Sequence, residues 1–170
     1  MSKKVVLAFS GGLDTSFCVP YLKEQGYEVH TVMVNTGGFS EEEEKAIEAR
    51  ALHLGAASHK NVNAVDTYYS KGIKYLIYGN ILKNATYPLS VSSERVFQAL
   101  EVLKHVKEIG ADAVAHGSTG AGNDQVRFDI VFEVLAPGVE IIAPVRENCF
   151  TRQYEIDFLQ QHGFDFSWEK

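Results

Sequence analysis

The sequence contains few cysteines and no long hydrophobic run, and each absence excludes a class of protein. Cys18 and Cys149 are its only two cysteines, and their separation is not that of a metal-binding pair. We expect both to be free, buried thiols in a reducing compartment. Because no stretch of about 18 apolar residues occurs, we expect no membrane-spanning helix. The apolar run near the basic start is too short for a signal peptide, so we expect a cytoplasmic protein.

The chain also lacks an excess of positive charge. It has 16 Lys and Arg residues against 22 Asp and Glu residues, which gives a net charge of −6. Surfaces that bind nucleic acid are normally basic, so we expect no nucleic-acid partner. With 170 residues, of which 45% are hydrophobic, the chain has the material for one well-packed domain spanning residues 1–170.

Short apolar runs alternate with helical segments along the whole chain. The runs predict strands at residues 3–10, 28–35, 60–65, 111–117 and 139–145. The segments between and after them predict helices at residues 14–25, 41–54, 67–82, 92–110, 123–136 and 151–162. Strands that alternate with helices usually form a parallel sheet covered on both faces. We therefore predict an α/β fold: a doubly wound, Rossmann-like sheet of five parallel strands.

Four local features refine this prediction. Ser40 is expected to cap a helix whose first turn is four glutamates, because negative charge is favoured there by the helix dipole. Pro20 should distort the first helix or shift its start. Asp66 is expected to cap the helix at 67–82, and the aromatic and aliphatic stripe of that helix is expected to lie in the core.

A glycine-rich stretch, AFSGGLDTS at residues 8–16, joins the first strand to the first helix. It lacks the lysine of the P-loop and the spacing of the dinucleotide loop, yet its composition suits a phosphate. Gly11 and Gly12 allow the backbone to approach an oxyanion, and the helix that follows presents a positive N-terminus. Asp14 would repel a phosphate unless a cation lay between them, which predicts magnesium. The alternative is a simple strand–turn–helix with Asp14 and Thr15 as its cap.

A second polar loop, HGSTGAGND at residues 116–124, follows the predicted fourth strand. Ligands of open parallel sheets bind outside the carboxyl ends of the strands. Both loops lie at such ends, so we expect them to face the same crevice.

The first loop resembles the pyrophosphate loop of the N-type ATP pyrophosphatases, which holds the β- and γ-phosphates of ATP while a nucleophile attacks the α-phosphate. LAFSGGLDTS and HGSTGAGNDQVRFD (116–129) together resemble the argininosuccinate synthase family, as do YLKEQGYEV (21–29), GADAVAHG (110–117) and IIAPVRE (141–147). The resemblance covers nearly the whole chain. It implies a ligase of arginine biosynthesis that condenses citrulline with aspartate through a citrullyl-adenylate, releasing AMP and pyrophosphate, in a homotetramer.

The resemblance also implies roles for individual residues. The implied ATP contacts are Ala8, Phe9, Ser10, Gly11, Gly12, Leu13, Asp14, Thr15, Ser16, Val34, His116 and Gly117, with Asp14 also binding magnesium. The implied aspartate contacts are Thr119, Asn123 and Asp124, and the implied citrulline contacts are Tyr87, Ser92, Asn123 and Arg127.

Catalysis is expected to depend on Asp14, Asp124 and Arg127. Arg127 suits a two-pronged contact with a carboxylate, although it could also be a surface residue of its helix. Asn123 and Asp124 could likewise be a helix cap. No general base is evident, and for His116 a structural role ranks ahead of proton transfer. We therefore expect catalysis mainly by positioning and charge stabilisation.

Several features depart from the family pattern. Ala121 and Val145 stand where the family usually has lysine and tryptophan, and residues 65–93 match loosely. The family chain is longer, and its second domain, which supplies further citrulline contacts and most of the oligomer interface, has no counterpart in these residues. We therefore expect these residues to bind ATP but to turn it over poorly or not at all. Two alternatives remain: a non-catalytic ATP-binding module, and a tRNA-thiolating pyrophosphatase, which would want a reactive cysteine pair and a basic surface.

Overall fold

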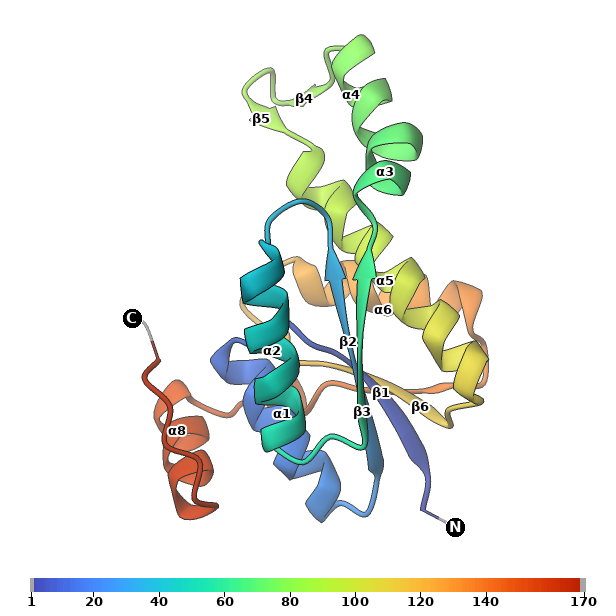
Figure 1. Cartoon of the computed structure of the whole chain (residues 1–170). Helices are drawn as coiled ribbons and strands as arrows, with labels where there is room; N and C mark the ends of the chain where they lie inside the picture. Colours follow the sequence, from blue (N-terminus) through green and yellow to red (C-terminus); the bar gives the residue numbers. More distant parts are fainter. Residues whose placement is uncertain (1, 169–170) are drawn as a thin grey trace.

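The computed structural model, which describes residues 2–168, contains a five-stranded parallel sheet with helices on both faces (Figure 1). The strands are β1 (Lys4–Ala8), β2 (Glu28–Asn35), β3 (Ser58–Asn63), β6 (Ala113–His116) and β7 (Glu140–Ile142). Their order across the sheet is β3-β2-β1-β6-β7, and every pair of neighbours is parallel. This arrangement confirms the predicted doubly wound, Rossmann-like fold.

Each face of the sheet is buried by its own set of helices. Successive residues of a strand point to opposite faces, so Val5 and Leu7 enter one hydrophobic cluster and Val6 enters the other. The first cluster is covered by α1 (Leu13–Glu24), α2 (Glu41–His53) and α8 (Arg152–Gln161). The second is covered by α5 (Ser90–Ile109) and α6 (Asp124–Leu135). Residues of β1 are therefore buried on both sides, as the continuous apolar run predicts.

Local capping explains where several helices begin. Ser40 caps α2 through a capping box, accepting from the Glu43 amide while Glu43 accepts from the Ser40 amide. This confirms the role predicted for Ser40. Thr151 caps α8 by accepting from the Tyr154 amide. α1 runs as one helix through Pro20 and begins at Leu13, one residue earlier than predicted.

Of the sheet strands, β2 has the predicted bounds and the others differ by a few residues, and two of these differences have a clear cause. β3 covers Ser58–Asn63 rather than residues 60–65, because this edge strand is mostly polar and half-buried and therefore carries little apolar patterning. The last strand ends at Ile142, and a short helix, α7 (Pro144–Glu147), replaces its predicted end. Proline has no amide hydrogen for a strand but suits the first turn of a helix.

The helix predicted at residues 67–82 is confirmed in part. Residues 65–78 are helical without a break, as α3 (Val65–Tyr68), a π-helical turn η1 (Tyr69–Ile73) and α4 (Lys74–Tyr78). The end of the predicted helix is instead part of a two-stranded hairpin of β4 (Leu82–Lys83) and β5 (Tyr87–Pro88). Ala64, not Asp66, occupies the N-cap position. These elements project beyond the carboxyl ends of the sheet strands (Figure 1).

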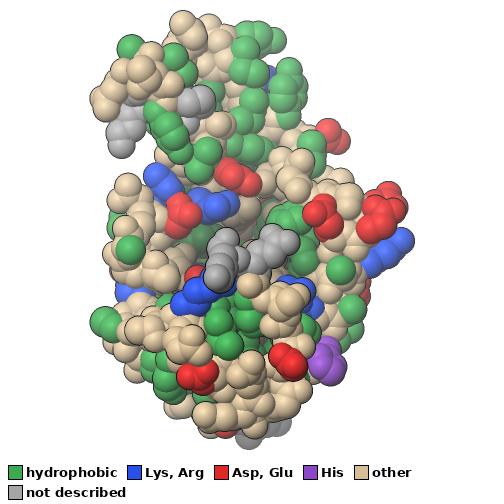
Figure 2. Space-filling view, turned by 90° about the vertical axis from the view of Figure 1, so that its left-hand side faces the viewer, with side chains coloured by type: hydrophobic (Ala, Val, Ile, Leu, Met, Phe, Trp, Pro, Cys, Tyr) green, Lys and Arg blue, Asp and Glu red, His purple; other side chains and the backbone are tan. Residues whose placement is uncertain are grey.

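The apolar stripe of this projecting segment is not in the core, contrary to the prediction. Figure 2 shows hydrophobic side chains gathered over the projecting end of the molecule. Within the stripe Tyr68 is buried, whereas six large hydrophobic side chains are exposed: Tyr69, Tyr75, Ile77, Tyr78, Ile81 and Leu82.

The cysteine prediction holds in part. Both thiols are free, and Cys18 is buried in α1, but Cys149 is exposed in the turn after α7. Within residues 2–168, no helix combines the length and apolar character needed to cross a membrane.

Candidate active site

The two polar loops open onto one cavity at the carboxyl ends of β1, β2 and β6. This main cavity has a volume of about 590 Å³. Ser10 and Asp14 line it from the first loop, and Gly117 and Thr119 line it from the second. Val34 at the end of β2 also lines it. The expectation that both loops face the same crevice is confirmed.

The first loop has the geometry of an anion-binding turn. Gly11 adopts a φ of +76°, a conformation that favours glycine, and Gly12 precedes the first turn of α1. No side chain caps α1, so the alternative of an Asp14 or Thr15 cap is wrong. The amides of the first turn lack intrahelical partners and can point at a ligand. The Thr15 hydroxyl steadies the turn by donating to the Gly12 carbonyl at 3.3 Å.

Not every implied ATP contact reaches the main cavity. Ala8, Phe9, Ser10, Gly12, Leu13, Asp14 and Thr15 all line it. Gly11 and Ser16 are not among its lining residues. Ser16 is fully buried, and within the described residues its hydroxyl has no hydrogen-bond partner.

The second loop packs directly on the start of α1. A Cβ atom at Gly117 would lie 3.1 Å from the backbone of Asp14 and Thr15, which is closer than side chains normally come to backbone. A larger residue here would require the two loops to move apart by a few tenths of an ångström. Gly117 thus keeps the second loop close to the start of α1.

His116 has the contacts of a structural histidine. Its ring is buried and stacks on Phe128, with 5.6 Å between ring centroids. Its Nε2 lies 3.0 Å from a carboxylate oxygen of Asp129, and its Nδ1 accepts from the Ser118 amide at 3.2 Å. Burial lowers the pKa of His116 and outweighs Asp129, which acts to raise it. A neutral ring with its proton on Nε2 satisfies both contacts.

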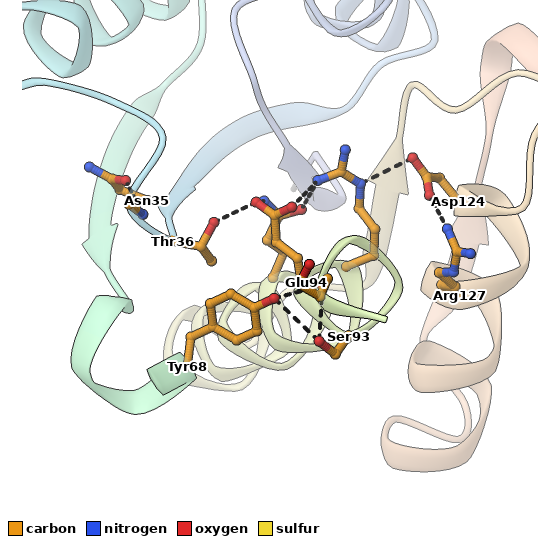
Figure 3. A network of polar contacts seen from close by, with 11 residues as sticks. Asn35, Thr36, Tyr68, Ser93, Glu94, Asp124 and Arg127 are labelled. Carbon is orange, nitrogen blue, oxygen red and sulfur yellow. Dashed lines mark hydrogen bonds and ion pairs between the residues drawn. The ribbon is translucent and has the colours of Figure 1, made fainter. Parts of the chain in front are cut away.

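A chain of charged and polar side chains borders the main cavity (Figure 3). Arg95 donates from Nε to Asp124 at 3.1 Å, and Arg127 donates to the other oxygen of Asp124 at 2.5 Å. Arg127 also donates to the Ser92 hydroxyl at 3.0 Å. Burial acts to raise the pKa of Asp124, but the two guanidinium groups outweigh it and lower that pKa. Asp124 is therefore a carboxylate held in place from two sides.

A second cavity of about 540 Å³ adjoins the main cavity at Asp124, which lines both. The four residues that the resemblance assigns to citrulline all line this second cavity: Tyr87, Ser92, Asn123 and Arg127. Asn123 precedes α6 but makes no side-chain cap there. The structure thus brings together residues from the hairpin, α5 and α6 that lie far apart in the sequence.

Sequence reasoning missed three residues of this site. Glu94 and Arg95 line the main cavity from the first turns of α5. Thr36 donates from its hydroxyl to Glu94 at 2.5 Å and so ties the end of β2 to α5 (Figure 3). Glu94 and Arg95 could have been suspected because they lie close in sequence to Ser92. Charged residues on an amphipathic helix, however, usually belong to its solvent-exposed face.

The residues present suit magnesium held jointly with phosphate, rather than a metal cage made by protein alone. In the described chain, no three His, Cys, Asp or Glu side chains cluster as metal ligands. Asp14 offers one carboxylate to the main cavity, and Mg²⁺ is usually bound by one or two carboxylates plus substrate phosphates. Glu155 of α8 is buried next to Asp14, and burial, followed by the charge and hydrogen bond of Asp14, raises the pKa of Glu155 to about 8.

The parallel sheet and the cavity between its two loops define an α/β domain of the Rossmann-like class. Comparison with known proteins agrees, since residues 4–165 match the arginosuccinate synthase N-terminal HUP domain. The chain is 48% identical to the argininosuccinate synthase of Xylella fastidiosa over 167 residues and 46% identical to that of Hyperthermus butylicus over 162 residues. It belongs to the argininosuccinate synthase family.

The two matches cover nearly all of this chain but much less of the relatives. They span 96% and 95% of the chain, and 41% and 40% of the two relatives. The synthase of Saccharolobus solfataricus, 43% identical, is matched over 98% of this chain and 42% of its own length. The chain thus spans about two fifths of the length of these relatives.

Proposed function

We propose that these residues form the ATP-binding part of a ligase that joins citrulline to aspartate, giving argininosuccinate, AMP and pyrophosphate. The observation that carries the proposal is the meeting of two cavities at Asp124. One is lined by the glycine loop and the other by Ser92, Asn123 and Arg127. The synthetase domain and the homotetramer that the family resemblance implies would involve residues outside these 170.

In this proposal the main cavity holds ATP and the second cavity holds citrulline, the two substrates of the first step. The pyrophosphate end of ATP lies against the first loop, with the nucleoside end towards Val34. Citrulline lies in the second cavity, where Arg127 can bind its carboxylate with a charge-assisted hydrogen bond. Thr119 and Asn123 donate to the carboxylate of aspartate, and Asp124 accepts from its amine. Asp124 thereby stands where the substrates must meet.

The reaction has two steps, and no covalent bond forms to the protein. The ureido oxygen of citrulline bonds to the α-phosphorus as the bond to the β-phosphate oxygen breaks and pyrophosphate leaves. The aspartate amine then bonds to the activated carbon as AMP leaves, and its proton passes to solvent. Positioning of this kind can contribute about 7–11 kcal/mol to lowering a barrier.

The chain's own groups act mainly by holding charge. The free amides at the start of α1 and the helix dipole stabilise the departing pyrophosphate. Arg95, which lines the main cavity, brings a guanidinium to the side of the phosphate chain nearest Asp124. Magnesium held by Asp14 and phosphate oxygens would neutralise further negative charge. His116, held between Asp129 and the Ser118 amide, keeps the second loop in place.

The test measures binding and turnover separately. Calorimetry with Mg·ATP measures binding, and chromatography of AMP and pyrophosphate, with citrulline and aspartate each omitted in turn, measures turnover. We expect ATP to bind and AMP release to be slow, citrulline-dependent and faster with aspartate. Binding of ATP that citrulline neither strengthens nor turns into AMP release would favour a non-catalytic ATP module, whereas AMP release stimulated by tRNA would favour a thiolating enzyme. No binding of ATP would refute the proposal.

A further inference from the structure

Helix α2 contacts the glycine loop with one face. A Cβ atom at Gly11 would lie 3.0 Å from the Ile47 side chain, so the loop is seated directly on the helix. Three residues further along, Arg50 donates a hydrogen bond from Nη1 to the Gly11 carbonyl. Residues three apart lie on the same face of a helix. The loop is therefore held by α2 at two neighbouring points.

The same helix also contacts the C-terminal segment, through three side chains that we call the aromatic tail: Phe164, Phe166 and Trp168. The Arg50 guanidinium lies over the rings of Phe166 and Trp168, at 5.2 and 5.4 Å from their centroids. One turn further on, His53 packs edge-on against Phe164, with 5.6 Å between centroids. Arg50 thus contacts the aromatic tail and the glycine loop at once.

The hydrogen bond to Gly11 orients the amide that follows it. A trans peptide is planar, with its carbonyl and its N–H pointing in opposite directions. Because Arg50 holds the Gly11 carbonyl towards α2, the Gly12 N–H points the other way, towards the Ser10 hydroxyl at 3.4 Å. Ser10 and Gly12 both line the main cavity. Glycine restricts its own backbone least, so this peptide needs an external contact to fix it.

We propose that Arg50 is a positioning residue for the phosphate loop, and that the aromatic tail holds Arg50 in place. The segment that follows α8 thereby influences how tightly the loop binds the pyrophosphate end of a nucleotide. The proposal deepens the proposed function and rests on it, because it takes the loop to be the site of the β- and γ-phosphates. A merely structural Arg50 would affect the whole domain equally, whereas a positioning residue affects only ligands that contact the loop.

The test compares three ligands by calorimetry in the presence of magnesium: ATP, inorganic pyrophosphate and AMP. Arg50→Met keeps an apolar stem but removes the donor. It should weaken ATP and pyrophosphate binding about tenfold, equivalent to 1.4 kcal/mol, and leave AMP binding unchanged. Arg50→Lys should recover part of the loss, because lysine can donate to the carbonyl but lacks the planar guanidinium that stacks on rings. Lys45→Met, which removes the same charge from an exposed position of α2, is the control.

The tail is tested in the same way. Trp168→Ala should weaken ATP binding in the same direction as Arg50→Met but less, because Phe166 remains in contact with the guanidinium. Ser167→Ala, an exposed neighbour, should have no effect. Trp168 is the only tryptophan in the sequence, so its fluorescence reports the position of Arg50 directly. ATP should change this fluorescence in the wild type and not in Arg50→Met.

The outcomes separate the two proposals. If the wild type binds ATP and Arg50→Met binds all three ligands as the wild type does, or weakens all three equally, the inference is overturned while the proposed function stands. If the wild type binds neither ATP nor pyrophosphate, both are wrong. If Arg50→Met fails to fold, Arg50→Lys and Trp168→Ala decide: wild-type affinity and a wild-type fluorescence response in both would overturn the inference.

Discussion

Replacing Glu155 with glutamine should stabilise the protein, and the gain should increase with pH. The Glu155 side chain is 1% exposed on α8, next to the Asp14 carboxylate on α1. Burial, then the charge and hydrogen bond of Asp14, raise the pKa of Glu155 to about 8 against the opposing effect of Arg152. The nearby Cys18 thiol has its own pKa raised by burial, so it stays protonated below pH 8.

The size of the effect follows from the two pKa values of Glu155. In the unfolded chain the carboxyl loses its proton near pH 4.5, whereas in the folded chain it keeps the proton until about pH 8. The unfolded state therefore binds fewer protons between these values, and the free energy of unfolding falls as pH rises. The full loss corresponds to about 5 kcal/mol, of which about 3 kcal/mol falls between about pH 5.5 and pH 8. Glutamine can donate to Asp14 as the protonated acid does, without this loss.

Urea unfolding of the wild type and Glu155→Gln, at several pH values and in a chelator without nucleotide, measures the difference directly. The stability difference should be small near pH 5 and should grow steadily towards pH 8. Asp157→Asn, an exposed acid-to-amide change on the same helix, should show no such growth. A wild-type curve that stays parallel to the Glu155→Gln curve would show that Glu155 titrates normally and that this reasoning is wrong.

Three further predictions concern the binding residues. Gly12→Val should abolish ATP binding, measured by calorimetry, because the side chain would block the approach of a phosphate to the backbone. It should preserve the fold, measured by thermal unfolding, because Gly12 has an ordinary φ of −73° and its Cβ would meet only the Ser10 hydroxyl at 3.5 Å. Asp14→Asn should weaken ATP binding when magnesium is present and have little effect when a chelator removes it. An equal loss of affinity with and without magnesium would show that Asp14 does not bind the metal. Arg127→Lys should raise the citrulline KM of the complete enzyme, because lysine cannot hold Asp124 and Ser92 with one planar group. The loss of one charge-assisted hydrogen bond should weaken citrulline binding by about 1.5–3 kcal/mol, and an unchanged KM and kcat would contradict the prediction.

The five-stranded parallel sheet could be predicted because its signals are local and mutually consistent. The apolar run of β1 ends at Gly11 and Gly12, and a helix follows at once, which is how a phosphate loop begins. Both polar loops then fall at the carboxyl edge of a parallel sheet. Fold class and the shared cavity follow from these positions without any side-chain detail.

The projecting segment could not be predicted for a physical reason. Apolar residues at helical spacing show that one face of a helix avoids water, but not what covers that face. Within the described residues Tyr78 stays 81% exposed, although the pattern indicates burial. Arg50 and Arg95 were missed because their pattern indicated exposure where the fold gives them contacts. Each has the spacing of a surface residue, and only the fold brings them to the glycine loop and to Asp124.

The central position of β1 determines when the site can form during synthesis. Val5 pairs with Val29 on one side and with Ala113 on the other. Ribosomes make chains from the N-terminus at about 5–20 residues per second, so the strand that carries the glycine loop waits for a neighbour that comes two thirds of the way along the 170 residues. Until β6 is made, one edge of β1 has unpaired backbone groups that could pair with other strands, and Gly117 cannot yet pack on the start of α1. The two loops that line the main cavity therefore come together only after β6 has been made.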